Sequence, residues 1–130
     1  MTVKDEKGNV DLHSVALFSE KEDETPIVLL HGWPGSFLEF LPTLDLVQNK
    51  YEPARLPFDL IAPSLPGYTL SSEPPQDQAW VGGNAARIID KALKMLGFDQ
   101  YVVQGEDVGC LIASLLGMTY DSVIGVHHKL

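Results

Sequence analysis

The sequence predicts an α/β fold built around a largely parallel sheet. Short apolar runs that end at glycine or proline alternate with longer segments whose apolar residues recur at helical spacing. The connections between successive runs are long enough for right-handed crossovers, which join parallel strands. The chain has 130 residues, of which 45% are hydrophobic and 21% charged, so the composition indicates a single folded domain rather than a disordered segment.

The strands are predicted from short apolar segments. Residues 1–9 are polar and predict a flexible N-terminus, and a rough alternation over 10–18 predicts an edge strand. The continuous apolar run 26–31, stopped by Gly32, is typical of a parallel strand covered on both faces. Further strands are expected over 58–63, over 101–104 and from 123 to at least 127.

The helices are predicted between these strands. Ser36 can cap a helix over 37–50, although Pro42 disturbs its first turns. Residues 83–96 form an amphipathic pattern that Gly97 stops, and residues 110–120 predict an apolar helix. The predicted strands and helices therefore alternate along the chain, as in an α/β protein whose helices flank the sheet.

Charge and composition exclude several classes of function. The formal net charge of −9 at pH 7 argues against binding to nucleic acid or to an anionic membrane, and favours a small neutral or cationic ligand. The single cysteine, Cys110, cannot form an internal disulfide. No apolar run approaches the roughly 20 residues of a membrane span, and the N-terminus lacks the pattern of a signal peptide. We therefore expect a soluble, cytoplasmic protein.

The turn from Gly105 to Gly109 carries the strongest chemical signal. Glycines two positions before and after Asp107 match a nucleophile elbow, where a strand turns so sharply into a helix that larger side chains would collide. Centring the motif on Glu106 would place larger residues at the tight positions, so the spacing selects Asp107. A carboxylate at an elbow implies attack on an sp³ carbon and formation of an ester. The alternative is that Asp107 only caps the following helix.

The segment from His31 to Gly35 follows the most apolar strand and supplies the second signal. Gly32 lets the backbone approach a ligand, and the amide of Trp33, with that of Val108, would form an oxyanion hole. We expect His31 to order this loop by hydrogen bonding rather than to titrate in catalysis. The Trp33 side chain fits a core position equally well.

Three segments in order resemble the epoxide hydrolases of the α/β-hydrolase superfamily, particularly the microsomal-type branch: HGWPGSFLEF at 31–40, PSLPGY at 63–68 and QGEDVG at 104–109. The resemblance implies that Asp107 is the ester-forming nucleophile and that the amides of Trp33 and Val108 form the oxyanion hole. We also expect His31, Gly32, Pro34 and Tyr68 to support the binding loops. Haloalkane dehalogenases share the aspartate elbow, but they usually have asparagine and tryptophan where Trp33 and Val108 stand here.

The resemblance covers only the N-terminal core half of such enzymes. Family members continue into a lid whose tyrosines protonate the epoxide oxygen, and then into loops whose acid and histidine activate water. His13, His127 and His128 match none of those positions. We therefore expect residues 1–130 to form a single incomplete α/β-hydrolase core domain without a lid, truncated after about the sixth strand. Its open sheet edge invites self-association or a partner chain.

Two further expectations concern the site. Glu106 replaces the glycine that is common before the nucleophile, and its like charge would raise the pKa of Asp107. Tyr68 is a candidate proton donor for ring opening, with packing of its loop as the alternative role. We expect no cofactor and no metal.

Three functions remain open at this stage. The leading one is hydrolysis of a small apolar epoxide to a diol through an Asp107 ester, incomplete in the chain as it stands. The others are non-hydrolytic epoxide binding or isomerisation in a natural-product pathway, and a non-catalytic interaction module.

Overall fold

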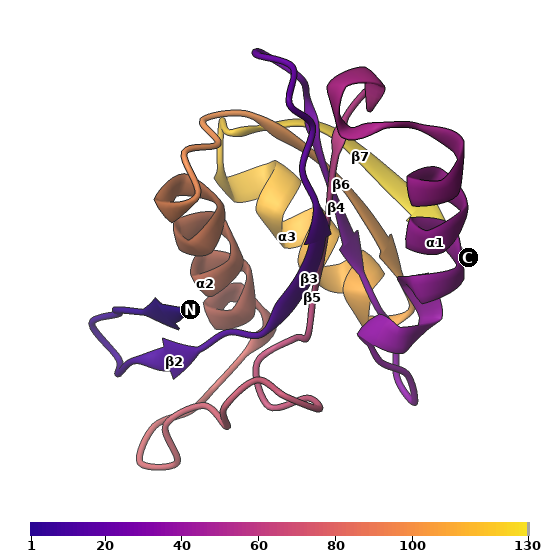
Figure 1. The fold of residues 1–130 in the computed structure, drawn as a ribbon. Helices are drawn as coiled ribbons and strands as arrows, with labels where there is room; N and C mark the ends of the chain where they lie inside the picture. The colour runs from indigo at the N-terminus through magenta and orange to yellow at the C-terminus, as the bar shows by residue number, and fades with distance from the viewer. Residues whose placement is uncertain (130) are drawn as a thin grey trace.

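The computed structural model describes residues 1–129 and has the predicted α/β architecture, with a twisted five-stranded sheet between two helical layers (Figure 1). The strand order is β3-β5-β4-β6-β7, and only the edge strand β3 runs antiparallel to its neighbour. The helix α1 covers one face, and α2 and α3 cover the other (Figure 1). The sheet strands are β3 (Ser14–Leu17), β4 (Pro26–Leu30), β5 (Asp59–Pro63), β6 (Tyr101–Glu106) and β7 (Val123–Lys129).

Each face of the sheet has its own core. On one face, residues of the central strands such as Val28 and Val103 pack against Ile89 of α2 and Leu116 of α3. On the other face, Leu29, Leu60 and Ala62 pack against Phe40 and Leu44. Burial on both faces explains why β4, and β5 after Asp59, are continuous apolar runs rather than alternating ones.

The helices lie close to their predicted positions, with small shifts that have local causes. The expected helix over 37–50 is a 3₁₀ turn, η1 (Phe37–Phe40), followed by α1 (Leu41–Lys50), because Pro42 is tolerated only in a first turn. Helix α2 spans Gly82–Met95. Helix α3 spans Val108–Thr119 and so begins two residues before the predicted Cys110, directly after Asp107.

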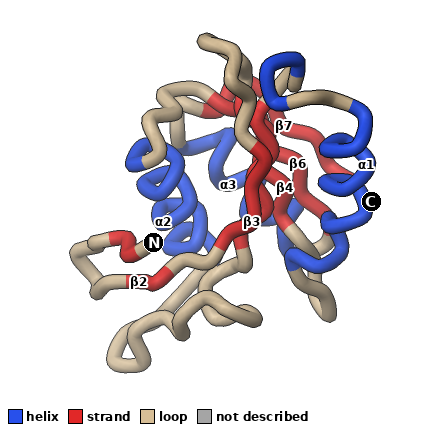
Figure 2. Tube along the Cα trace, in the orientation of Figure 1, coloured by secondary structure: helices blue, strands red, loops and turns tan. Residues whose placement is uncertain are grey.

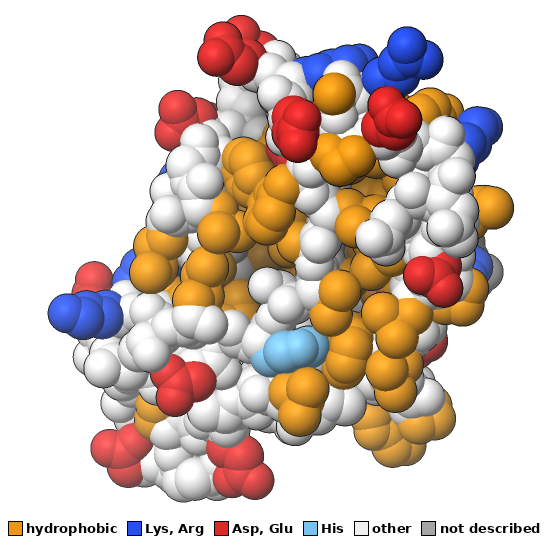
Figure 3. All heavy atoms as spheres, in the orientation of Figure 1, with side chains coloured by type: hydrophobic (Ala, Val, Ile, Leu, Met, Phe, Trp, Pro, Cys, Tyr) orange, Lys and Arg blue, Asp and Glu red, His pale blue; other side chains and the backbone are white. Residues whose placement is uncertain are grey.

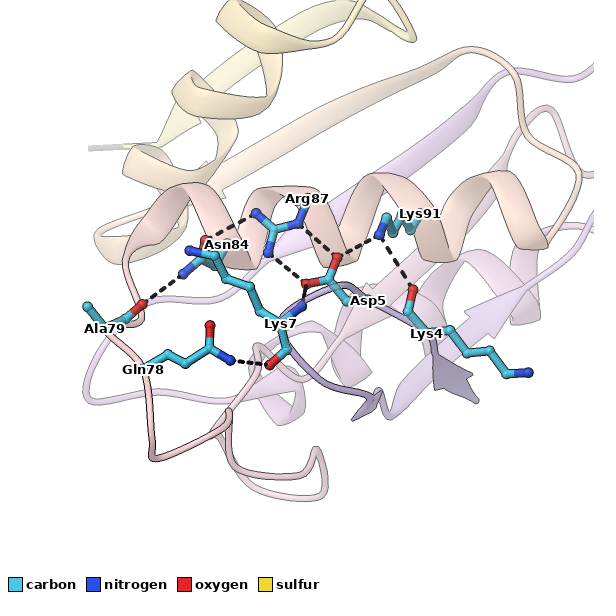
Figure 4. A network of polar contacts seen from close by, with 8 residues as sticks. All are labelled: Lys4, Asp5, Lys7, Gln78, Ala79, Asn84, Arg87 and Lys91. Carbon is cyan, nitrogen blue, oxygen red and sulfur yellow. Dashed lines mark hydrogen bonds and ion pairs between the residues drawn. The ribbon is translucent and has the colours of Figure 1, made fainter.

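The N-terminal residues, for which the sequence predicts a flexible terminus, are folded against α2 in the structure. Strand β1 (Thr2–Val3) pairs with β2 (Val10–Asp11), and between them Asp5 forms ion pairs with Arg87 at 2.7 Å and Lys91 at 2.6 Å (Figure 4). The predicted strand over 10–18 is therefore divided between β2 and β3.

The loops that carry the candidate chemistry follow β4, β5 and β6. These strands are parallel, so their carboxyl ends meet at one end of the sheet, which is the lower end in Figure 1. A long irregular segment, interrupted by no helix or strand from 64 to 81, lies at the same end (Figure 2). The site therefore lies at a sheet end surrounded by loops.

The opposite edges of the sheet differ in their surroundings. Hydrophobic side chains reach the surface on both sides of β3, with acidic groups around them (Figure 3). Strand β7 pairs with β6 alone among the described residues, and its Ile124 and Val126 side chains are exposed. No helix within residues 1–129 is both long and apolar enough to cross a bilayer.

Candidate active site

The elbow between β6 and α3 has the geometry that its glycine spacing predicts. Asp107 adopts φ 49° and ψ −117°, outside the regions that most residues occupy. A Cβ atom on Gly105 would overlap the carbonyl of Gly109, and one on Gly109 would overlap the carbonyl of Leu30. Glycine is therefore required at both positions so that β6 can turn directly into α3 beside the end of β4.

The loop after β4 meets this elbow at the Asp107 carboxylate. The backbone N–H of Trp33 donates a hydrogen bond of 2.9 Å to Oδ2 of Asp107. A Cβ atom on Gly32 would lie only 2.8 Å from Cβ of Asp107, so glycine is needed for this approach. Two motifs that are 74 residues apart in sequence thus form one arrangement.

The Asp107 carboxylate is ionised and accessible. Hydrogen bonds from the backbone N–H groups of Trp33 and Val108 lower its pKa below the usual aspartate value. The expectation that Glu106 raises the pKa of Asp107 is therefore wrong. Oε2 of Glu106 instead pairs with Nζ of Lys129 at 3.0 Å, so the charge of Glu106 is compensated there.

Asp107 opens into a shallow hollow of about 290 Å³ at the end of the sheet. The Trp33 side chain on its wall is 68% exposed, which rules out the alternative of a core position. The hollow is lined by Gly32, Trp33, Pro34, Glu39, Glu106, Asp107 and Lys129. A larger hollow of about 690 Å³ lies at the amino ends of β4 and β5, away from the elbow, and includes Pro26 and Asp59 in its wall.

His31 is completely buried and joins two loops. Its Nε2 accepts a hydrogen bond of 3.1 Å from the Leu65 N–H, so Nδ1 carries the hydrogen and donates to the carbonyl of Gly32 at 3.0 Å. Burial lowers the pKa of His31, which keeps the ring neutral. The Tyr68 ring packs edge-to-face on it, with 5.1 Å between ring centroids. These contacts fit the loop-ordering role expected of His31, and they place Tyr68 against it.

The other histidines lie apart from this arrangement. Nδ1 of His13 is 2.9 Å from Oγ of Ser64, and Nε2 of His128 is 3.0 Å from Oγ of Ser114. His127 is exposed on β7. Within residues 1–129, no histidine hydrogen-bonds to Asp107, and no group of three or more potential metal-ligating side chains comes together.

Sequence reasoning missed two groups in the wall of the hollow, Glu39 and Lys129. The signal for Glu39 is present, because Ser36 and Glu39 have the spacing of a capping box, and both reciprocal hydrogen bonds of that box form. No local pattern marks Lys129, which reaches Glu106 only because β7 pairs in parallel with β6.

A second, apolar hollow of about 160 Å³ adjoins the elbow through Val108. Tyr68 and Trp80 contribute aromatic rings to it, and Ile112 lies on the side of α3. The elbow therefore has a charged hollow on one side and an apolar one on the other.

Comparisons with known proteins identify the fold and its relatives. A family model described as the alpha/beta hydrolase fold matches residues 25–125, and one described as the epoxide hydrolase N terminus matches residues 1–40. The structure of the Aspergillus niger epoxide hydrolase superposes with a TM-score of 0.93 at 48% identity, covering 99% of this chain and 33% of that one.

Relatives from animals are also similar. The juvenile hormone epoxide hydrolase of Bombyx mori superposes with a TM-score of 0.81 at 31% identity, over 93% of this chain and 33% of that one. Epoxide hydrolase 1 of Sus scrofa is 37% identical over 106 residues, which are 78% of this chain and 23% of that protein.

The chain spans about 30% of the length of curated relatives that it matches over nearly all of its own length. The alpha/beta hydrolase fold model covers most of the chain. The two solved structures that superpose on it are both named epoxide hydrolases. The chain therefore belongs to the α/β hydrolase fold family, in which its similarity is to the N-terminal part of epoxide hydrolases.

Proposed function

We propose that this chain carries the ester-forming half of an epoxide hydrolase site, with Asp107 as the nucleophile. The proposal rests on the Asp107 carboxylate, which is held by a backbone hydrogen bond and is nevertheless open to the hollow. Oδ2 of Asp107 accepts a hydrogen bond from the Trp33 amide, while the side chain as a whole is exposed to the hollow. A residue that merely capped α3 would accept a hydrogen bond from the second or third amide of that helix, but this capping hydrogen bond is absent here. Only the first amide of α3, that of Val108, donates to Asp107.

The two carboxylate oxygens have different roles in this proposal. Oδ1 attacks a ring carbon of the epoxide, the carbon–oxygen bond of the ring breaks, and its electron pair goes to the epoxide oxygen. That oxygen takes a proton from water, and the hydroxide left behind is consumed when the ester is later hydrolysed. The product is a hydroxyalkyl ester of Asp107. The lowered pKa of Asp107 keeps the attacking carboxylate ionised at neutral pH.

Oδ2 becomes the carbonyl oxygen of that ester. When water adds to the ester carbon, negative charge develops on Oδ2, where the Trp33 N–H already donates. The Val108 N–H, which also lowers the pKa of Asp107, is the second donor. Collapse of the intermediate returns the carboxylate and releases the diol, so water and epoxide are the only reactants consumed.

Release of the diol needs a base that activates water. No histidine within residues 1–129 hydrogen-bonds to Asp107, and loss of a general base typically removes about 10²–10⁴-fold in rate. We therefore propose that the 130-residue chain on its own accumulates the ester rather than completing turnover.

The proposed substrate is a small apolar epoxide. The apolar hollow beside Val108, with the rings of Tyr68 and Trp80, suits a hydrocarbon group held next to the attacking oxygen. In this arrangement Tyr68 packs on His31 and supports the loop, and Pro34 lines the opposite hollow with Gly32.

One observation favours a second function, that of an interaction module. Strand β7 has a single neighbour among the described residues, and its Ile124 and Val126 side chains are 52% and 41% exposed. An apolar strand edge of this kind can pair with a strand of another chain. This function needs no chemistry at Asp107.

Intact-mass analysis after incubation with a reactive aryl epoxide tests the main proposal. We expect a stable mass increase of one epoxide in the native chain and none in Asp107→Asn. The matched control is Asp45→Asn, which removes an exposed carboxylate of α1 and should label like the native chain. Equal labelling of the Asp107→Asn variant would overturn the assignment of the nucleophile, and multiple turnovers by the native chain would overturn the claim that the ester accumulates.

A further inference from the structure

A series of hydrogen bonds leads from the interior of the protein to the Asp107 carboxylate, and its inner half lies in the loop after β5. Oγ of Ser71 accepts a hydrogen bond of 3.0 Å from the His13 N–H and donates one of 2.6 Å to the carbonyl of Ser64. Both serines are buried. The Ser71 hydroxyl therefore passes hydrogen bonding on in one direction, from the segment before β3 toward Ser64.

The middle of the series passes through the His31 ring. The carbonyl of Ser64 and the N–H of Leu65 belong to one peptide group, and that N–H donates to Nε2 of His31 at 3.1 Å. On the other side of the ring, the Nδ1–H donates to the carbonyl of Gly32 at 3.0 Å. Because His31 is completely buried, water does not compete for either ring nitrogen. The ring therefore links the loop after β5 to the loop after β4.

The last donor is the Trp33 amide. The carbonyl of Gly32 and the N–H of Trp33 form one peptide group, and that N–H donates to Oδ2 of Asp107 at 2.9 Å. Each group accepts on the side away from Asp107 and donates toward it. We call this arrangement the donor series. Its members in order are the His13 N–H, the Ser71 hydroxyl, the Ser64–Leu65 peptide, His31, the Gly32–Trp33 peptide and the Asp107 carboxylate.

The backbone of the loop after β5 brings Ser71 into place. Gly67 and Thr69 have φ angles of 84° and 46°, which lie in the left-handed region. The Tyr68 N–H donates to the carbonyl of Leu65 at 2.8 Å, and the Ser71 N–H donates to the carbonyl of Tyr68 at 3.0 Å. Two consecutive turns thus fold the loop back on itself, so that the Ser71 side chain reaches the carbonyl at the start of the loop.

Hydrogen bonds in series polarise one another when every member donates in the same direction, so each N–H becomes a stronger donor, and the effect is larger away from water. We propose that Ser71 is a positioning residue that, through the buried His31 ring, aims and strengthens the Trp33 N–H donor at Oδ2 of Asp107. The inference deepens the proposed function, since Oδ2 is the oxygen on which charge develops, and rests on it only for the effect on the ester.

Two magnetic resonance signals report this link without any epoxide. Ser71→Ala removes the hydroxyl that both accepts and donates, so we expect the Trp33 amide proton to move upfield in a ¹⁵N-labelled chain as its hydrogen bond weakens. The pKa of Asp107, followed by its carboxyl ¹³C shift, should rise by about 0.1–0.6, because loss of the series removes roughly 10–30% of one charge-assisted hydrogen bond. The near-isosteric Ser71→Cys, whose S–H is a weaker donor, should give smaller changes in the same direction. This variant decides the question where Ser71→Ala fails to fold.

The adjacent serine provides the matched control. Oγ of Ser72 accepts a hydrogen bond of 2.9 Å from the Asp11 N–H, so it ties the same loop to the same N-terminal segment without entering the donor series. If the serines only supported the loop, Ser72→Ala and Ser71→Ala would have similar effects, whereas the proposal predicts changes at Trp33 and Asp107 for the Ser71 variants alone. Unchanged signals in both Ser71 variants, or equal changes in Ser72→Ala, would overturn the proposal.

Cleavage of the ester by added hydroxylamine is a separate readout. The hydroxylamine nitrogen bonds to the ester carbon, the diol leaves with the proton that the nitrogen loses, and Asp107 remains as a hydroxamate. Negative charge passes through Oδ2, so Ser71→Ala should slow this cleavage about 1.3–4-fold, and Ser72→Ala should not. Equal cleavage rates in the native chain and Ser71→Ala would contradict the proposal. If the native chain forms no ester while the Trp33 and Asp107 signals follow the expected pattern, the donor series stands and the proposed chemistry of Asp107 fails.

Discussion

Two aspartates in this molecule, Asp5 and Asp107, have lowered pKa values for different reasons. The Asp5 side chain is fully enclosed and lies between two cations, of which Arg87 donates to both carboxylate oxygens and Lys91 donates to Oδ1 (Figure 4). Asp107 is exposed and is held by the backbone amides of Trp33 and Val108. The first carboxylate fastens the N-terminus to α2, and the second faces a hollow.

The difference shows how a protein keeps a carboxylate reactive. Side-chain cations neutralise Asp5 and bond to both of its oxygens, and the side chain is enclosed, so the group serves structure. Backbone amides keep Asp107 ionised without a counter-ion in contact, and they need no room for long side chains. The reactive aspartate is thus the one held by the backbone, and the structural one is held by side chains.

The largest effect should come from closing the space that the elbow needs. Gly109→Ala places a Cβ atom on the carbonyl of Leu30, and we expect a loss of about 3 kcal/mol in the free energy of unfolding or no cooperative transition at all. Gly83→Ala is the control, since its Cβ meets nothing within 4 Å, and it should stabilise the chain by about 0.5–1 kcal/mol. Thermal melts followed by circular dichroism decide this, and equal melting of the two variants would contradict the elbow geometry.

Breaking the N-terminal ion pairs should lower stability and leave the site intact. Asp5→Asn removes the charge between Arg87 and Lys91, and we expect a loss of about 1–3 kcal/mol in the free energy of unfolding. Labelling by the epoxide should continue in this variant. Asp107→Asn should show the reverse, with no labelling and an almost unchanged melting temperature. A variant that loses both properties together would show that the two regions are coupled.

Lowering the pH should remove the contribution that the Asp5 ion pairs make to the free energy of unfolding. The pKa of Asp5 is lower in the folded chain than the usual value of about 3.9, so its ion pairs contribute stability above that pH. This contribution is lost as pH falls below about 4 toward the folded-state pKa. Melting temperatures of the native chain and Asp5→Asn should therefore converge in acid. A difference that stays constant down to the lowest pH would contradict the ion-pair account.

The smallest expected effect concerns the sheet edge. Ile124 is exposed on β7, and we expect the isolated chain to self-associate through this edge. Ile124→Lys should reduce the apparent mass in size-exclusion chromatography, whereas Leu46→Lys, at an even more exposed apolar position on α1, should not. If the native chain is monomeric at all concentrations, the prediction of self-association is wrong and the interaction-module function loses its support.

The sequence predicted the parts of this molecule that depend on local pattern. The strand over 26–31 and the turn from Gly105 to Gly109 are apparent because burial and close packing restrict the residue types there. The contact between Trp33 and Asp107 was expected because parallel strands bring their carboxyl ends together.

The parts that sequence missed depend on contacts between distant residues. The ion pair of Asp5 with Arg87 spans 82 residues, so the charged N-terminus alone gave no sign of it. The effect of Glu106 on Asp107 was misjudged because neighbours in a sequence need not share surroundings. Glu106 is the last residue of β6 and meets Lys129 of β7, whereas Asp107 turns toward the loop after β4.

The most direct measurement of the central claim is peptide mapping of the chain after reaction with the epoxide. Digestion and tandem mass spectrometry locate the ester among the acidic residues, including Asp5, Glu39 and Glu106. The account predicts a single ester on Asp107, lost when Gly32→Ala displaces that side chain. An ester on Glu39 or Glu106, or labelling spread over exposed carboxylates with Asp107 unmodified, would contradict it.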